Sequence, residues 1–269
     1  NLNAGEYRNG VLVWFLAVLP LALITAAVYW FFVIEGSLIL ALVWNVLVLY
    51  LTMGFRQFSH AFTGISKALR VDDLEAARSH LADWTGQPTS ELTSDEISKL
   101  TIEQGVIDSY RYVFGTIFWF VVLAWLAGPA GAIVYRAACL LQQKWRYSEP
   151  FGNFATTILA VMDYLPVRLA AAGFAVMGDF EDAVQCWREQ AREWSDYDYG
   201  ILLASAAGAL GVRLGDVVHQ DHTVRFRPEL GVGDVANADY LASAVGLVWR
   251  SVLLWLALIL LFSASQWMA

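Results

Sequence analysis

The chain has 269 residues, of which 58% are hydrophobic and only 16% are charged, whereas an average soluble domain carries about 25% charged residues. Its formal net charge of -8 argues against nucleic acid as a partner, because nucleic acid selects basic surfaces. The two cysteines, Cys139 and Cys186, provide neither a disulfide framework nor a metal-ligand spacing. These properties indicate an integral membrane protein.

The first 55 residues are predicted to form a transmembrane hairpin. An uncharged run of 24 residues, Val11 to Ile34, is long enough to span about 30 Å of hydrocarbon at about 1.5 Å per residue. Pro20 is expected to kink this helix. The run is longer than the apolar core of a secretory signal and lacks a small-residue cleavage site, so we expect no signal peptide. A second apolar run extends from Leu38 to Phe55.

Residues 56–111 are polar and are predicted to form a small helical region outside the bilayer. The segment Val71 to Arg78 has an acidic start, Asp72 and Asp73, which is typical of a helix. The stretch Trp84 to Ser90 contains glycine and proline and predicts a turn. Thr93 to Glu96 has the spacing of a capping box, which marks the start of another helix.

The third apolar region, residues 112–141, is too long for one upright span and is interrupted by Gly128-Pro129-Ala130-Gly131. Two interpretations compete, namely two short helices joined at the Gly-Pro turn and one long kinked helix. We favour the break, because glycines flank the proline.

The apolar stretch from Phe154 to Gly178 carries Asp163, Pro166 and Arg168. Two charges and a proline are tolerated at membrane depth only where they face protein or water. We therefore expect a re-entrant or interfacial helix here as an alternative to a full span.

The remainder of the chain is predicted to hold a polar extramembrane segment, residues 179–240, and a last span from Leu241 to Ser263. The fold class is therefore an all-α integral membrane protein with about four or five transmembrane helices, some broken or re-entrant, and a small helical extramembrane region. The predicted regions are an N-terminal transmembrane hairpin (1–55), a cytoplasmic helical region (56–111), broken transmembrane or re-entrant helices (112–178), a polar extramembrane segment (179–240) and a C-terminal transmembrane helix (241–269).

Basic residues indicate the orientation, because they gather on the cytoplasmic side of membrane proteins. Arg8 precedes the first span, and Arg56 and Arg111 flank the long polar stretch, whereas the hairpin turn at Glu35 has neither Lys nor Arg. The N-terminus and residues 56–111 are expected to be cytoplasmic in a bacterial inner membrane. The side of residues 179–240 depends on whether 154–178 crosses.

Four charged residues in apolar runs are candidates for function, because a charge at membrane depth is expensive. Asp163 and Arg168 are five residues apart, so they form either a ligand site or a structural ion pair that pins a broken helix. Arg136 either faces an anionic group or extends to the membrane interface, and the same two interpretations hold for Arg250.

Two loop features are weaker candidates. The segment Phe226 to Asp234 is a glycine-rich loop that includes Arg227; it could hold phosphate, but a plain surface loop is the better interpretation. His219 and His222 flank Asp221 closely, yet no further ligand is nearby, so we interpret them as solvated loop residues and predict no metal site.

Several stretches from about residue 50 to the end resemble the CobD/CbiB family of membrane proteins, which is associated with adenosylcobinamide-phosphate synthesis. The most specific are the D-x-x-P-x-R segment and the G-A-L-G-x-x-L-G segment. The matching stretches are Pro88 to Leu92, Gly128 to Ala137, Met162 to Leu169, Gly208 to Gly215 and Arg227 to Gly231.

The chain departs from the synthases of this family at several carboxylates. After the matched Glu103, the family's A-E-N-T-x-D-G motif has its Glu at the position of Ile107 and its Asp at that of Arg111. The family's N-T-L-D stands where this chain has Ala138 to Leu141. ATP-dependent amide synthesis needs carboxylates for Mg²⁺ and for charge handling, so these departures argue against retention of that mechanism.

The same departures resemble the AmpE branch of the superfamily, because Tyr110-Arg111-Tyr112 precedes Phe118-Trp119. That resemblance implies an inner-membrane sensor or regulatory protein, and we favour one that is not an enzyme. The excess of cations over carboxylates among Arg111, Arg136, Asp163 and Arg168 suggests an anionic ligand. The alternative is an amide-forming ligase of cobamide assembly, with Glu103, Asp108 and Asp163 as substitute carboxylates. A second alternative is a structural partner of a membrane complex.

The expected partners are the lipid bilayer and an anionic small molecule or phospholipid-like ligand. Nucleic acid is excluded, the oligomeric state is open, and the sequence indicates no particular cofactor. The predicted ligand-binding residues are Arg111, Arg136, Asp163, Arg168, Arg227 and Glu103.

Overall fold

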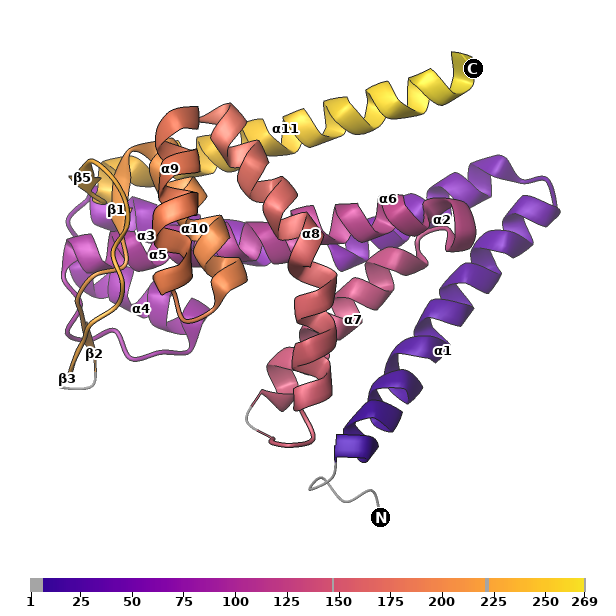
Figure 1. The fold of residues 1–269 in the computed structure, drawn as a ribbon, viewed down its shortest axis with the longest axis horizontal. Coiled ribbons are helices and arrows are strands. Elements are labelled where there is room, and N and C mark those ends of the chain that lie inside the picture. Colours follow the sequence, from indigo (N-terminus) through magenta and orange to yellow (C-terminus); the bar gives the residue numbers. More distant parts are fainter. Residues whose placement is uncertain (1–6, 147, 221–222, 269) are drawn as a thin grey trace. The chain divides into compact units, whose positions relative to one another are not determined.

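The computed structural model describes residues 7–146, 148–220 and 223–268, and it is mainly helical (Figure 1). The helices are α1 (Tyr7–Ile34), α2 (Leu38–Thr52), α3 (Phe55–Arg70), α4 (Leu74–Thr85), α5 (Ser94–Ser109), the π-helix η1 (Tyr110–Phe114), α6 (Gly115–Ala127), α7 (Ala130–Trp145), α8 (Asn153–Met177), α9 (Phe180–Gln190), the short 3-10 helix η2 (Ala191–Glu193), α10 (Tyr197–Leu210) and α11 (Ala238–Met268). The strands are β1 (Val212–Leu214), β2 (Val218–Gln220), β3 (Thr223–Arg225), β4 (Leu230–Gly231) and β5 (Asp234–Val235).

Among the described residues, 4 helices are long and apolar enough to cross a membrane. They are Tyr7–Ile34, Ser94–Ala127, Asn153–Met177 and Ala238–Ser265, and Leu38–Thr52 is a shorter apolar helix. The prediction of an all-α, multi-pass membrane protein is confirmed, since each of the five strands has only two or three residues.

The chain divides into two compact units. Unit 1 comprises Asn1–Gly54 and Arg111–Pro166, and unit 2 comprises Phe55–Tyr110 and Val167–Ala269. Each unit is therefore built from two separate stretches of sequence.

Unit 1 is a bundle in which α1, α2, α6 and α7 pack against one another. Its core contains Trp14 and Val18 from α1, Tyr135 from α7 and Leu159 from α8. The predicted break at the Gly-Pro turn is confirmed: α6 ends at Ala127, Gly128 has a φ of +56°, and α7 begins at Ala130 and returns along α6.

The helix α8 differs from its prediction. It runs from Asn153 to Met177 with Pro166 inside it, and it is long enough for a full span. The helix is continuous, and its placement across the bilayer or at the interface stays a prediction. Its second half is held by packing in unit 2, where Ala170, Ala171 and Phe174 are completely buried, and this packing offsets the hydrogen bond that proline cannot donate.

Unit 2 is organised around α5, which contacts α3, α4, α10 and α11. The predicted capping box is confirmed, because the Thr93 side chain accepts from the Glu96 backbone and the Glu96 side chain accepts from the Thr93 backbone. The antiparallel neighbours α9 and α10 lie side by side (Figure 1), and Gly208 permits their close approach because a Cβ there would overlap the backbone of Asp182.

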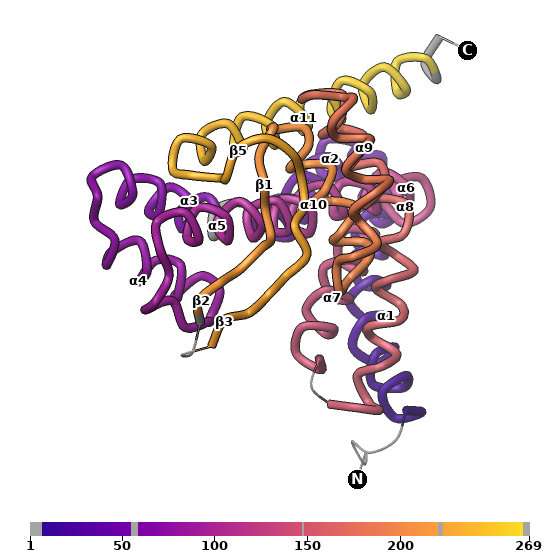
Figure 2. Tube along the Cα trace, turned by 60° about the vertical axis from the view of Figure 1, so that its left-hand side comes forward, coloured from indigo at the N-terminus to yellow at the C-terminus, as the bar shows by residue number. Residues whose placement is uncertain are grey.

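The short strands of unit 2 form two small sheets. The strand β1 lies between β4, which is antiparallel to it, and β5, which is parallel. The strands β2 and β3 form a separate antiparallel ribbon that reaches α5 (Figure 2). The interpretation of Phe226 to Asp234 as a plain surface loop is therefore wrong in part, because it contributes β4 and the start of β5.

Candidate functional site

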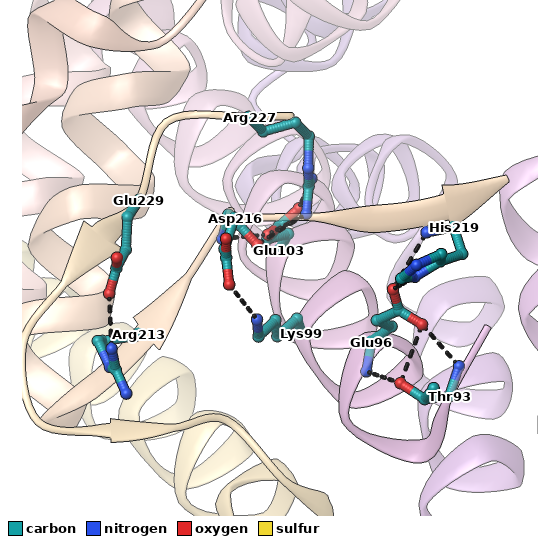
Figure 3. A network of polar contacts seen from close by, with 10 residues as sticks. Thr93, Glu96, Lys99, Glu103, Arg213, Asp216, His219, Arg227 and Glu229 are labelled. Carbon is teal, nitrogen blue, oxygen red and sulfur yellow. Dashed lines mark hydrogen bonds and ion pairs between the residues drawn. The ribbon is translucent and has the colours of Figure 1, made fainter. Parts of the chain in front are cut away.

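One face of α5 carries a row of charged side chains that unit 2 buries. Glu96, Lys99 and Glu103 are spaced by three and four residues, which places them on the same side of a helix, and each is 5–6% exposed. Buried charges need partners, because removal from water is costly. The segment from Arg213 to Glu229 supplies partners for all three (Figure 3).

Glu103 and Arg227 form the most extensive of these pairs. The Arg227 guanidinium donates to both carboxylate oxygens, with Nη1 at 2.5 Å from Oε2 and Nη2 at 3.2 Å from Oε1. The backbone N–H of Gly215 also donates to Oε1 at 2.8 Å, and Nη2 reaches the Gly215 carbonyl at 3.2 Å. Three donors therefore fix the position of the buried Glu103 side chain.

Lys99 pairs with Asp216 from the turn that follows β1, at 3.4 Å between Nζ and Oδ2. The backbone N–H of Val217 is the main cause that lowers the pKa of the Asp216 carboxyl, and the charge of Lys99 adds to it. Asp216 is half-exposed, so solvent weakens this pair relative to the one at Glu103.

Glu96 joins its capping partner Thr93 to the β2–β3 ribbon. Its Oε1 lies 2.6 Å from Nδ1 of His219 and accepts from the His219 backbone N–H at 3.1 Å. His219 lies in β2 and not in a loop, so its prediction is wrong in that part, whereas its side chain is half-exposed as expected for a solvated residue. The neighbouring Asp221 and His222 lie outside the described residues.

A cavity of about 240 Å³ opens beside this row of charges. Glu103, Arg225 and Arg227 line it, so two guanidinium groups and one carboxylate face the same space. The remaining lining residues are polar or aliphatic: Leu81, Thr85, Gln87, Thr89, Leu100, Gln104, Ile107 and Val218. The excess of cationic groups favours a ligand that carries an anionic group.

Arg227 has hydrogen-bonding capacity that the described residues do not use. Its Nε is buried and has no hydrogen-bond partner among them. An unsatisfied buried donor costs about 1–3 kcal/mol, which a ligand oxygen would offset. A metal cluster has less support, since no group of three His, Cys, Asp or Glu side chains among the described residues could together hold an ion.

Unit 1 holds a second polar cluster, which contains three of the predicted site residues. The Tyr135 hydroxyl donates to Oδ1 of the buried Asp163 at 2.8 Å. The Arg136 guanidinium lies over the Tyr112 ring, at 4.3 Å from its centre, in a cation–π contact. Arg111 belongs to the same region, because Arg111, Arg136 and Asp163 all act electrostatically on the buried Cys139.

Arg168 lies in unit 2, where it pairs with Asp198 of α10 at 3.1 Å and lies 5.9 Å from the centre of the Tyr197 ring. Thus the six predicted residues fall into three groups. Glu103 and Arg227 contact each other at a cavity, Arg111, Arg136 and Asp163 gather in unit 1, and Arg168 has its own carboxylate partner.

Sequence analysis missed several residues of the cavity and its charged row. Lys99, Asp216 and Arg225 were not among the predicted site residues. The regular spacing of Glu96, Lys99 and Glu103 was a readable signal, because three charges on one face of a partly apolar helix need partners. The partners themselves are more than 100 residues away, and no local pattern identifies them.

Comparison with known proteins gives a consistent result. A family model described as "CobD/Cbib protein" matches residues 2–248. The chain is 35% identical to the cobalamin biosynthesis protein CobD of Stutzerimonas stutzeri over 264 residues, which is 96% of this chain and 83% of the relative. It is 34% identical to CobD of Chromobacterium violaceum over 224 residues, 82% of this chain and 70% of that relative. No solved structure matches the chain.

These relatives overturn the expected role of a sensor or regulatory protein. That expectation rested on a few missing carboxylates in two short motifs, whereas the similarity to proteins named for cobalamin biosynthesis extends over nearly the whole chain. Cobalamin biosynthesis is therefore the better interpretation, and it corresponds to the alternative that the sequence left open.

Proposed function

Because this chain belongs to the CobD/CbiB family, we propose that it is a membrane-bound, amide-forming enzyme of cobalamin biosynthesis, of the adenosylcobinamide-phosphate synthase type. The observation that carries the proposal is the 35% identity to a CobD protein over 264 residues. The cavity beside Glu103 is the place in unit 2 whose chemistry fits such a reaction.

Amide formation joins a carboxyl carbon to an amine, so its substrates carry ionised groups that must be bound in a fixed orientation. Arg225 and Arg227 supply planar guanidinium donors, which bind carboxylate or phosphate oxygens with defined geometry. The unused Nε of Arg227 supports the same assignment. These two residues therefore hold the anionic part of a substrate.

Glu103 is the carboxylate that remains at this site. Arg227 and Gly215 fix its position, so that it can bind an ammonium group or orient an amine. Of the other substitute carboxylates considered from the sequence, Asp108 accepts from Trp84 and Gln104, and Asp163 accepts from Tyr135. Glu103 is the one of the three that lines the cavity.

The size of the cavity limits what it holds. Its volume of about 240 Å³ is below the range of about 300–1,000 Å³ that is usual for drug-sized ligands. A complete corrinoid is larger than such ligands. The cavity therefore suits the small amine substrate, with its anionic group at the arginines and its amine near Glu103.

Complementation of a bacterial strain that lacks the synthase tests the proposal. The wild-type gene is expected to restore cobamide-dependent growth, because the encoded protein supplies the missing amide-forming step. The Glu103→Gln variant, which is nearly isosteric, is expected to reduce the rate of complementation at least tenfold through loss of the carboxylate charge.

The matched control is Arg213→Gln, which breaks an ion pair of the same unit that does not line the cavity. Immunoblots of the membrane fraction must show equal amounts of each variant. Failure of the wild-type protein to support growth would refute the proposed activity. Equal growth with both variants would refute the role of Glu103 while leaving the activity in place.

We also propose that the protein resides in the bacterial inner membrane with its N-terminus and residues 56–111 in the cytoplasm. The support is the distribution of Arg8, Arg56 and Arg111 about the apolar runs. Reporter fusions after Glu35 and after Arg70 test it: a periplasmic reporter should be active only after Glu35, and the reverse pattern would refute the orientation.

A further inference from the structure

One polar residue of the charged cavity has an orientation that its neighbours fix. Gln104 follows Glu103 on α5, and both side chains line the cavity of about 240 Å³. The Nε2 of Gln104 donates to Oδ1 of Asp108 at 3.0 Å. Asp108 lies one helical turn farther along α5, is 7% exposed and is not one of the residues that line the cavity. The side-chain amide of Gln104 is therefore tied to a buried carboxylate behind the cavity wall.

The Asp108 carboxylate selects one orientation of this amide. Its other oxygen, Oδ2, accepts from the indole Nε1 of Trp84 at 2.9 Å, and an indole nitrogen is only a donor. A carboxylate accepts hydrogen bonds and does not donate them. Gln104 must therefore turn its NH₂ group toward Asp108, which leaves its carbonyl oxygen on the other side of the amide.

Packing in turn holds the indole of Trp84. Its ring makes an edge contact with Phe62, at 6.4 Å between the ring centres, and it packs against the hydrophobic core that α3, α4 and α5 share. Trp84 comes from α4 and Phe62 from α3, whereas Gln104 and Asp108 come from α5. Three helices of unit 2 thus fix one side-chain amide at the cavity.

The carbonyl oxygen of Gln104 is available to a ligand. Among the described residues, this Oε1 accepts no hydrogen bond, and it is not one of the buried polar atoms that lack a partner. Arg225 and Arg227, which line the same cavity, are donors only. An amine that enters the cavity needs acceptors for its N–H groups, and Glu103 and Gln104 supply them.

We propose that Gln104 determines specificity for the amine end of the substrate, where its Oε1 accepts a hydrogen bond from an N–H group. Asp108 and Trp84 are positioning residues that keep the Gln104 amide in this orientation. The inference rests on the proposed function, which places the amine near Glu103. A neutral acceptor binds an N–H of both the ammonium and the free amine, so the amine can lose the proton that blocks its lone pair and still keep this contact.

Binding to the purified full-length protein in detergent micelles tests the proposal, measured by isothermal titration calorimetry. The probe is phosphoethanolamine, which joins a phosphate to a primary ammonium group. Phosphocholine has no N–H group, and inorganic phosphate reports on binding at the arginines alone. The wild type is expected to bind phosphoethanolamine about tenfold more tightly than phosphocholine, the effect of one hydrogen bond to a charged group.

Two single variants remove the acceptor in different ways. Gln104→Leu deletes it. In Asp108→Asn, the new side-chain oxygen still accepts from Trp84, so the new NH₂ group faces Gln104 and reverses its amide. Each variant is expected to lower the affinity for phosphoethanolamine about tenfold and to leave the affinity for inorganic phosphate unchanged.

A double variant separates this role from general damage to the site. In Asp108→Asn/Gln104→Glu, the new carboxylate accepts from the new NH₂ group and again presents an acceptor oxygen to the cavity. The affinity for phosphoethanolamine should return to within about threefold of the wild-type value. The matched control is Gln185→Leu on α9, because Gln185 likewise donates to a carboxylate four residues later, Glu189 at 3.3 Å, but does not line the cavity. It should bind all three probes as the wild type does.

Three results would overturn the proposal: a wild type that does not prefer phosphoethanolamine to phosphocholine, a Gln104→Leu variant that binds phosphoethanolamine as the wild type does, and a double variant that binds it no better than Asp108→Asn. Complementation by the wild-type gene decides the proposed activity separately. Growth together with unchanged binding by Gln104→Leu would overturn the role of Gln104 alone. Lack of growth together with the expected binding pattern would refute the activity and support the amine contact.

Discussion

Replacement of Arg227 by glutamine is the most direct perturbation of the charged site. The variant Arg227→Gln deletes both hydrogen bonds from the guanidinium to Glu103. The Glu103 side chain, which is 7% exposed, then keeps the hydrogen bond from the Gly215 backbone N–H. Loss of one partner of a buried pair costs about 3–5 kcal/mol. Because Arg227 is itself 22% exposed and Gly215 still donates, we expect a loss of about 3 kcal/mol.

The free energy of unfolding is measured by titration with sodium dodecyl sulfate in mixed micelles, for the wild type, Arg227→Gln, Glu103→Gln and the double variant. This double-mutant cycle isolates the interaction of the two side chains, for which we expect a coupling energy of about 2 kcal/mol. The comparison variant Arg213→Gln breaks a pair whose members are 43% and 49% exposed, so it should cost less than about 1 kcal/mol.

The reasoning would be refuted by equal losses for Arg227→Gln and Arg213→Gln. It would also be refuted by a coupling energy below about 0.5 kcal/mol, since non-interacting sites add to within that amount.

Three further predictions concern other parts of the two units. Tyr135→Phe removes the hydrogen bond to Asp163 and should lower the free energy of unfolding of the protein by about 1 kcal/mol in the same titration, because the buried carboxylate loses this hydrogen bond. Thr93→Ala removes the capping box of α5 and should cost about 1 kcal/mol. Folding lowers the pKa of Asp216 below its ordinary value of 3.8. Its carboxylate therefore stabilises the protein above pH 3.8, and this stabilisation is lost as the pH falls through the lowered pKa. In a plot of melting temperature against pH, Asp216→Asn should lose less stability below about pH 4 than the wild type does.

Matched controls make these three predictions decisive. Tyr164→Phe changes an exposed tyrosine and should have a smaller effect than Tyr135→Phe. Thr93→Ser keeps the capping hydroxyl, so a loss equal to that of Thr93→Ala would contradict the role of the cap. For Asp216, parallel pH profiles of the wild type and the Asn variant would contradict the assignment.

The amino-acid sequence by itself identified the helices that are apolar and long enough to cross a membrane. Long apolar runs leave the backbone no alternative to helix in hydrocarbon, so Val11 to Ile34 and Leu241 to Ser263, the latter with Arg250 as its one charge, were identified as candidate spans without knowledge of packing. Local chemistry also located the break at Gly128 and the capping box at Thr93, because both depend on residues within a few positions of one another.

Tertiary structure decided the features that depend on packing. The helix α8 continues through Pro166, and neighbouring helices bury its second half, a stabilisation that local propensity does not include. The sequence analysis placed a boundary at residue 111 between an extramembrane region and a span. In the structure, the helix that begins at Ser94 continues past this position to Ala127.

The candidate site shows the same division. Spacing along one helix revealed that Glu103 shares a face with Glu96 and Lys99, but its partner Arg227 is 124 residues away. Only the return of the chain through the short strands brings that guanidinium to the carboxylate. The sequence therefore identified the charged residues as candidates, whereas the folded chain determined which of them meet at a cavity, because contacts between distant segments depend on the packing of the whole unit.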